Sequence, residues 1–272
     1  HSVKELRGIG IQPDLLICRC ERKITDTDKE KMALFCNINA KNIIQALDVT
    51  NIYELPLVLN RENLDERVLY NLNIKKYKKA NLKKWQEISN LQKNPKNSVN
   101  IGIIGKYVEL KDAYKSLSEA LYHSGIHNST EIKIIWINAE KSVNFKSVLK
   151  HLNGILVPGG FGKRGILGKI NSIKFARENN IPFLGICFGM QLAVIEYAQN
   201  VINIKNASSS EFKIKNAENI IGLMTEWIKD GKNIKRTINT DYGGSMRLGS
   251  YECILKNKSL ISKIYNKNII EE

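Results

Sequence analysis

The chain has 272 residues, of which 43% are hydrophobic, and carries a formal net charge of +15. This length accommodates one large domain or two ordinary ones with a sizeable core. The sequence contains no run of about 18 apolar residues and no signal peptide. Its five cysteines lack the spacing of a disulfide framework, which indicates a reducing compartment. We therefore expect a cytoplasmic protein without a membrane span.

The positive charge is spread along the chain rather than gathered in a patch. The lysines are interspersed with asparagine and isoleucine residues, which argues against a nucleic-acid site. The same charge suits polyphosphate ligands at least as well. We therefore expect no nucleic acid among the partners.

The first 72 residues mix predicted helices with one strand. Residues 3–9 form a short amphipathic start, and residues 13–18 are predicted to be a strand. The helical segments predicted next cover residues 29–35, capped by Thr25, Asp26 or Thr27, then 41–47 and 65–70. Residues 52–58 are predicted to be extended, because Leu55 precedes a proline.

Residues 73–98 are polar, charged and rich in asparagine, and we interpret them as a linker with one helix around residues 82–88. From residue 99 onward, the predicted strands and helices alternate. The predicted strands are 99–105, 131–137, 154–157 and 183–186, and the predicted helices are 112–124, 145–152, 166–179 and one beginning at Met190.

This alternation predicts an α/β fold, a parallel sheet flanked by helices, in which the active site lies beyond the carboxyl ends of the strands. We divide the chain into residues 1–72, the linker 73–98 and an α/β domain over 99–272.

Residues 185–189, Gly-Ile-Cys-Phe-Gly, have the form of a nucleophile elbow between a strand and a helix. The two glycines permit a sharp turn, and Cys187 is placed at a helix N-terminus, where the dipole and free N–H groups favour the thiolate. From the residues alone, the alternative is an inert core cysteine.

A second glycine-rich turn, Pro-Gly-Gly-Phe-Gly at 158–162, follows the preceding strand, so both turns should meet. Attack by a thiolate on an amide develops an oxyanion that needs two N–H donors. The N–H of Phe188 and one from residues 159–161 could supply them; the alternative is an ordinary strand–helix turn. Cys18 and Cys20 are too isolated for a zinc site, and we expect no metal ligands.

The stretches Leu184 to Gln191 and Val157 to Gly162 resemble the class I glutamine amidotransferases. Residues 1–14, 105–114, 210–212 and 243–249 narrow the resemblance to the CTP synthase family, and these motifs span nearly the whole chain. The resemblance implies a flavodoxin-like glutaminase domain preceded by the C-terminal part of a synthetase (amidoligase) domain.

The same resemblance implies a reaction and its partners. ATP with Mg²⁺ phosphorylates UTP, and ammonia from glutamine then replaces that oxygen to give CTP. GTP activates glutamine hydrolysis, CTP inhibits as product, and the enzyme is a homotetramer.

The resemblance also assigns roles to residues. Cys187 would form a γ-glutamyl thioester, and Glu211 would bind the α-amino group of glutamine. The other positions implied are Gly160, Phe161, Phe188, Gly189, Met190 and Gln191 for glutamine, Lys31 for the pyrimidine nucleotide, Leu47, Asp48 and Val49 for ATP, and Arg236 and Arg247 for a lid that meets GTP. Residue type alone would make Glu211 and Lys31 solvated surface charges, and the two arginines solvated lid charges.

Two family features are absent from the sequence. None of the histidines at positions 1, 123, 127 and 151 stands in the family's His-Pro-Glu context, and the synthetase P-loop is also missing. We therefore expect a piece of a longer enzyme that cannot make CTP by itself and that hydrolyses glutamine weakly or not at all if Glu272 is its true end. The alternatives are another amidotransferase or hydrolase of the same fold, and a non-catalytic fragment that acts as an assembly module.

Overall fold

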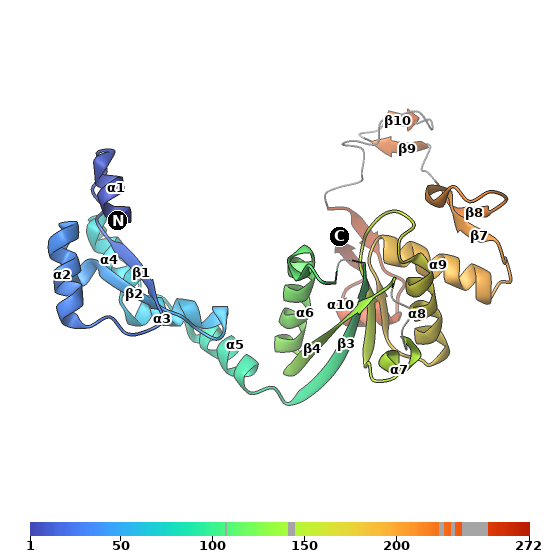
Figure 1. Ribbon diagram of the computed structural model, residues 1–272, viewed down its shortest axis with the longest axis horizontal. Helices are drawn as coiled ribbons and strands as arrows, with labels where there is room; N and C mark the ends of the chain where they lie inside the picture. Colours follow the sequence, from blue (N-terminus) through green and yellow to red (C-terminus); the bar gives the residue numbers. More distant parts are fainter. Residues whose placement is uncertain (107, 141–144, 223–225, 230–231, 236–249) are drawn as a thin grey trace.

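The computed structural model describes residues 1–272 except 107, 141–144, 223–225, 230–231 and 236–249. Its main feature is a four-stranded parallel sheet of order β4-β3-β5-β6 with helices around it (Figure 1). The strands are β3 (Asn97–Gly105), β4 (Thr130–Asn138), β5 (Gly154–Val157) and β6 (Phe183–Gly185). The predicted α/β fold is confirmed.

Helices cover both faces of this sheet. On one face, a β-carbon on Gly105 would meet the Tyr114 hydroxyl, which places η3 (Lys111–Tyr114) and α6 (Lys115–His127) there. Neighbouring residues of a strand point to opposite faces, and Ile104 belongs to the core cluster on the other side. That side is covered by α8 (Ile166–Glu178) and α9 (Phe188–Asn200), which pack against each other; α7 (Phe145–Leu149) precedes β5.

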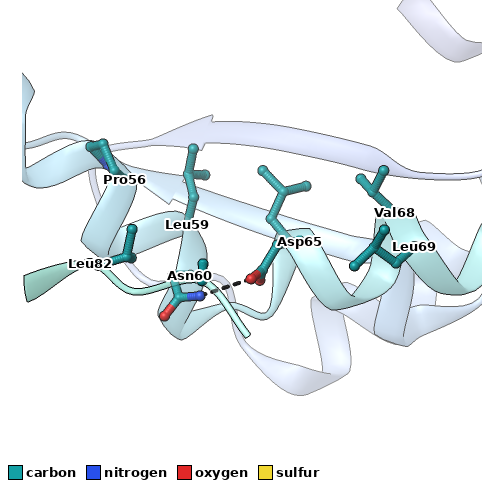
Figure 2. A pocket seen from close by; sticks show the side chains of 9 residues that line it. Pro56, Leu59, Asn60, Asp65, Val68, Leu69 and Leu82 are labelled. Carbon is teal, nitrogen blue, oxygen red and sulfur yellow. Dashed lines mark hydrogen bonds between the residues drawn. The ribbon is translucent and has the colours of Figure 1, made fainter. Parts of the chain in front are cut away.

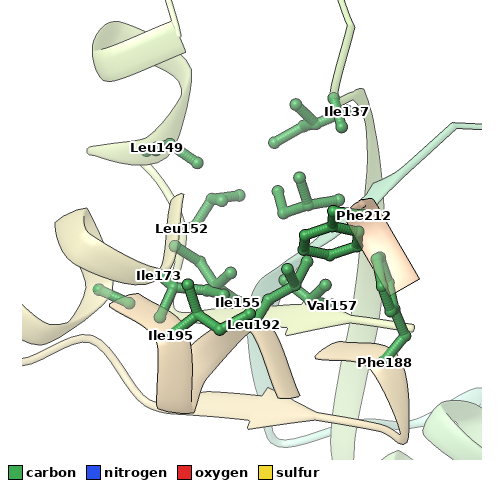
Figure 3. Close-up of a cluster of buried hydrophobic side chains, with 13 residues drawn as sticks. Ile137, Leu149, Leu152, Ile155, Val157, Ile173, Phe188, Leu192, Ile195 and Phe212 are labelled. Atoms are coloured by element: carbon green, nitrogen blue, oxygen red, sulfur yellow. The ribbon is translucent and has the colours of Figure 1, made fainter. Parts of the chain in front are cut away.

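The core lies between the sheet and the pair α8 and α9 (Figure 3). Ile155 and Val157 of β5 meet Leu192 and Ile195 of α9, and all four are at most 2% exposed. Burial of each such side chain contributes about 1.5–3 kcal/mol. The first half of α9 is therefore packed against β5.

The N-terminal unit is built on a parallel pair, β1 (Leu16–Cys20) and β2 (Ile43–Leu47). Its helices are α1 (Ser2–Gly8), α2 (Asp26–Cys36), η1 (Ala40–Asn42), η2 (Ile52–Glu54), α3 (Leu55–Arg61) and α4 (Leu64–Asn71), followed by α5 (Lys83–Lys93). Thr25 caps α2 as predicted, because its hydroxyl accepts from the Asp28 N–H at 3.1 Å.

Two predictions in this unit are wrong. Residues 41–47 are not a helix: η1 is followed by β2, whose Ile43 and Ile44 are 1% exposed because they pair with β1 inside the unit. Residues 52–58 are not extended. Pro56 stands in the first turn of α3, where its missing N–H costs no hydrogen bond.

Polar contacts of Tyr53 link the two units. Tyr53 of η2 donates from its hydroxyl to Glu119 of α6 at 3.2 Å, and His123 of the same helix lies 2.5 Å from that hydroxyl. His123 is thus engaged at the junction between the units.

The C-terminal segment adds short elements around the sheet. They are β7 (Ala207–Ser209), η4 (Ser210–Phe212), β8 (Glu218–Ile221), the pair β9 (Glu226–Lys229) and β10 (Lys232–Lys235), then β11 (Glu252–Ile254), α10 (Leu260–Tyr265) and β12 (Ile269–Glu271). Within the described ranges, no helix has the length and apolar character needed to cross a membrane.

Candidate active site

Cys187 lies at the N-terminus of α9 in a strained backbone conformation. Its φ and ψ are 51° and −103°, a region that residues with a β-carbon rarely adopt and that costs about 1–3 kcal/mol. The side chain is exposed, unlike that of an inert core cysteine. Strain of this kind is typical of a nucleophile elbow.

The two glycines of the elbow are required by close packing. A β-carbon on Gly189 would stand 2.1 Å from the Val157 carbonyl oxygen, and one on Gly185 would stand 2.6 Å from the Gly189 carbonyl carbon. The Ile186 N–H also donates to the Val157 oxygen at 3.0 Å. The elbow is therefore anchored to the end of β5.

This packing brings the loop 158–162 to Cys187, as the sequence predicted. A β-carbon on Gly159 would lie 3.7 Å from the Cβ of Cys187, whereas one on Gly160 would meet nothing within 4 Å. Among the described residues, the N–H groups of Gly160 and Phe188 have no hydrogen-bond acceptor. Both are thus available to an oxyanion formed beside Cys187.

The side chains after Cys187 differ in exposure. Phe188 is 2% exposed and packs edge-on against Phe212, with ring centroids 5.9 Å apart (Figure 3). Because this side chain is buried, only the main chain of Phe188 can face a substrate. Gly189 is buried, Gln191 is half-buried and Met190 is exposed, so Met190 and Gln191 are the residues that present side chains.

Glu211 of η4 reaches the glycine loop. Its Oε1 accepts from the Gly162 N–H at 2.7 Å. Phe161, which is 62% exposed, belongs to the same part of the loop. The structure thus brings Cys187, Gly160, Phe161 and Glu211 together around one edge of the sheet.

Sequence reasoning missed a cluster of charged residues beside this loop. Arg164 donates two hydrogen bonds, of 2.9 and 2.7 Å, to the carboxylate of Glu140. These bonds hold the pKa of Glu140 below its usual value. Lys106 donates to the Phe161 carbonyl at 2.6 Å. The signal that could have found Lys106 is its position directly after β3, at the same sheet edge as Cys187.

Lys169 of α8 belongs to the same neighbourhood and is 2% exposed. Its Nζ lies 5.0 Å from the ring centroid of Phe188, the residue that follows Cys187. Burial, reinforced by the positive charge of Lys106 and opposed by Glu140, lowers the pKa of Lys169 to about 8.

The residues expected to bind the pyrimidine nucleotide and ATP lie in the N-terminal unit. Leu47 ends β2, and Asp48 follows it, accepting from Arg19 Nε at 2.8 Å and donating its N–H to the Cys20 carbonyl at 3.0 Å. Lys31 is exposed, 4.0 Å from Asp28. Val49 follows Asp48 directly, while Arg236 and Arg247 lie outside the described residues.

The N-terminal unit also holds an apolar groove of about 460 Å³ between α3, α4 and the segment just before α5 (Figure 2). Asn60 donates to Asp65 at 3.1 Å at its edge. The groove contains no nucleophile and is separate from Cys187. In the part of the chain that is described, no group of three or more His, Cys, Asp or Glu residues could hold a metal ion.

Family models match most of the chain. Residues 109–270 match the family described as "Glutamine amidotransferase class-I", and residues 1–74 match "CTP synthase N-terminus". Among solved structures, the Trypanosoma brucei "CTPS - glutaminase domain with bound acivicin" aligns with a TM-score of 0.53 and 34% identity, covering 64% of this chain and 65% of that one.

Curated relatives named "CTP synthase" align over the whole chain. The protein of Pelagibacter ubique is 56% identical and that of Brucella anthropi 50% identical, each over 274 residues. These alignments cover 100% of this chain but only 51% and 50% of the relatives, so the chain spans about half of their length.

Proposed function

The chain belongs to the class I glutamine amidotransferases, and from that membership we propose that it carries the glutamine-hydrolysing part of a CTP synthase. The observation that carries the proposal is the strained Cys187 at the N-terminus of α9, with the loop of Gly159 packed beside it. No finding favours the non-catalytic assembly module.

In the proposed reaction, the thiolate of Cys187 attacks the γ-carboxamide of glutamine. The oxyanion of the tetrahedral intermediate accepts hydrogen bonds from the Phe188 and Gly160 N–H groups. A general acid protonates the amide nitrogen, so that collapse breaks the C–N bond, expels ammonia and leaves a γ-glutamyl thioester; water then releases glutamate and the thiol. Glu211 binds the α-amino group of glutamine through the charge it presents at the loop.

The remaining assignments belong to the same proposal. Ammonia aminates UTP after phosphorylation by Mg-ATP, which arrives as a substrate, and Lys31 and residues 47–49 contact these nucleotides. Arg236 and Arg247 meet the activator GTP. We further propose the division at 1–72, 73–98 and 99–272, a homotetramer, a cytoplasmic location, and a general base supplied by a His–carboxylate pair outside this sequence.

The proposal is tested in the full polypeptide that carries this chain. Glutamine-dependent formation of CTP from UTP and ATP should disappear in Cys187→Ala, while formation from added ammonium should persist. A glutamine-mimicking electrophile, 6-diazo-5-oxo-norleucine, should add once to the wild type and not to Cys187→Ala, as read by intact mass. Glutamine hydrolysis without any UTP-dependent chemistry would instead identify another amidotransferase.

A further inference from the structure

One peptide group of the glycine loop is held from both sides by opposite charges. Lys106 Nζ donates to the Phe161 carbonyl at 2.6 Å, and the Gly162 N–H donates to Glu211 Oε1 at 2.7 Å. This carbonyl and this N–H belong to the same planar peptide group, in which they point in opposite directions. The two charged side chains therefore fix the orientation of that plane.

Little else holds this part of the loop. Phe161 is 62% exposed, and β-carbons on Gly160 or Gly162 would meet nothing within 4 Å. Glycine-rich backbone is conformationally free, whereas hydrogen bonds to charged groups are the strong ones. The position of the loop thus depends on its backbone contacts rather than on side-chain packing.

The clamped peptide lies two peptide groups after the one that contains the Gly160 N–H, the amide that would serve the chemistry. The Gly160 N–H stands one residue before Phe161, in a loop that packs against Cys187 at Gly159. A rotation of the clamped peptide would change the backbone dihedrals of its neighbours and turn that N–H away. A preorganised donor is effective only if its direction is fixed before reaction.

We propose that Lys106 is a positioning residue for glutamine hydrolysis: it holds the Phe161 carbonyl and so aims the Gly160 N–H at the oxyanion. This inference rests on the proposed function. Glu211 then has two tasks, because the carboxylate that would receive the substrate's α-amino group also anchors the loop. Binding of glutamine and orientation of the oxyanion donor are thereby coupled through one side chain.

The test compares Lys106→Met and Lys106→Arg with Lys163→Met in the full polypeptide. Lys163 is an exposed lysine of the same loop and serves as the matched control. In Lys106→Met, kcat for glutamine hydrolysis should fall roughly 100-fold, the effect expected for loss of one oxyanion donor, with KM changed less than about threefold. Lys106→Arg should recover most of the loss, and Lys163→Met should match the wild type.

Two further measurements separate positioning from other roles. Iodoacetamide alkylates a thiol without an oxyanion, so its rate at Cys187 should stay within about twofold in Lys106→Met. Ammonium-dependent formation of CTP should also stay unchanged, which excludes a general folding defect.

Equal hydrolysis by Lys106→Met and the wild type would overturn the inference. So would a parallel fall in the iodoacetamide rate, because Lys106 would then act on the thiol itself. Absence of glutamine hydrolysis in the wild type would instead refute the proposed function.

Discussion

Gly189 packs against the carbonyl of Val157 so closely that a β-carbon at position 189 would lie 2.1 Å from that oxygen. The two nearest atoms, the oxygen and the carbon of this carbonyl, belong to the backbone, so no rotation of a side chain can relieve the clash. Gly189→Ala should therefore force the start of α9 off the end of β5 and destabilise the fold by about 3 kcal/mol or more. Urea unfolding followed by circular dichroism measures this loss.

Gly160→Ala is the matched control, because a β-carbon there would meet nothing within 4 Å. Its free energy of unfolding should stay within about 1 kcal/mol of the wild type. Glutamine hydrolysis by the full polypeptide should nevertheless fall, since the new methyl group occupies space that we assign to the substrate. Equal stability losses in both variants would contradict the geometry of the elbow.

The elements that the sequence predicted well are those with unambiguous patterns. Residues 99–105 and 154–157 are short apolar runs bounded by glycine or polar residues, and both are strands. Residues 41–47 fit a helical pattern but form the end of η1 and β2, because so short a mixture of apolar and polar residues fits either structure and the pairing with β1 is decided by contacts 27 residues away.

The turn at Cys187 and the loop beside it could be predicted because glycines mark both of them at fixed spacing. The charged clamp on the loop could not. Lys106 and Glu211 stand 55 and 49 residues from their partners in the loop, and each looks like an ordinary surface charge in sequence. Long-range contacts of this kind leave no local pattern.

Arg177 of α8 and Glu196 of α9 form an ion pair in which only the carboxylate is buried, and a double-mutant cycle can test it. Glu196 is 1% exposed and receives hydrogen bonds of 3.0 Å from Nε and 2.8 Å from Nη2 of Arg177. Arg177→Met should cost about 3–5 kcal/mol, because it leaves a buried carboxylate without its cation. Adding Glu196→Gln should recover part of that loss.

The control cycle uses Lys133 and Glu131, an exposed pair 3.4 Å apart on β4. Its coupling energy should be below about 0.5 kcal/mol. Thermal unfolding of the four variants in each cycle gives both values. A coupling as small at Arg177 and Glu196 would mean that the pair contributes no more than a surface contact.

Cysteine reactivity should follow exposure. Cys187 is exposed, whereas burial raises the pKa of the Cys18 thiol, and the neighbouring Cys20 and Cys36 add to that effect. At pH 7.5, limiting iodoacetamide should therefore modify Cys187 at least about tenfold faster than Cys18. Peptide mapping by mass spectrometry measures both rates, and Cys187→Ala identifies the fast product. Faster modification of Cys18 would contradict the burial of its thiol.

Lys169 should make the stability of the fold depend on alkaline pH. Its pKa is lowered from 10.5 to about 8 by burial and by the charge of Lys106, so the folded state holds fewer protons than the unfolded state between these values. Stability therefore rises with pH across that window and is reduced below pH 8, by on the order of 3 kcal/mol.

Lys169→Met should remove this dependence, because it keeps the length of the side chain and carries no charge. The variant should be more stable than the wild type at pH 7, and the difference should shrink as the pH rises from 8 to 10.5. Denaturant unfolding at four pH values measures it, with the exposed Lys163→Met as the control for other alkaline titrations. A difference that stays constant across this range would show that Lys169 does not titrate in the folded protein. A variant that is less stable than the wild type at pH 7 would show that the contact of the cation with the ring of Phe188 stabilises the fold by more than the burial of the charge costs.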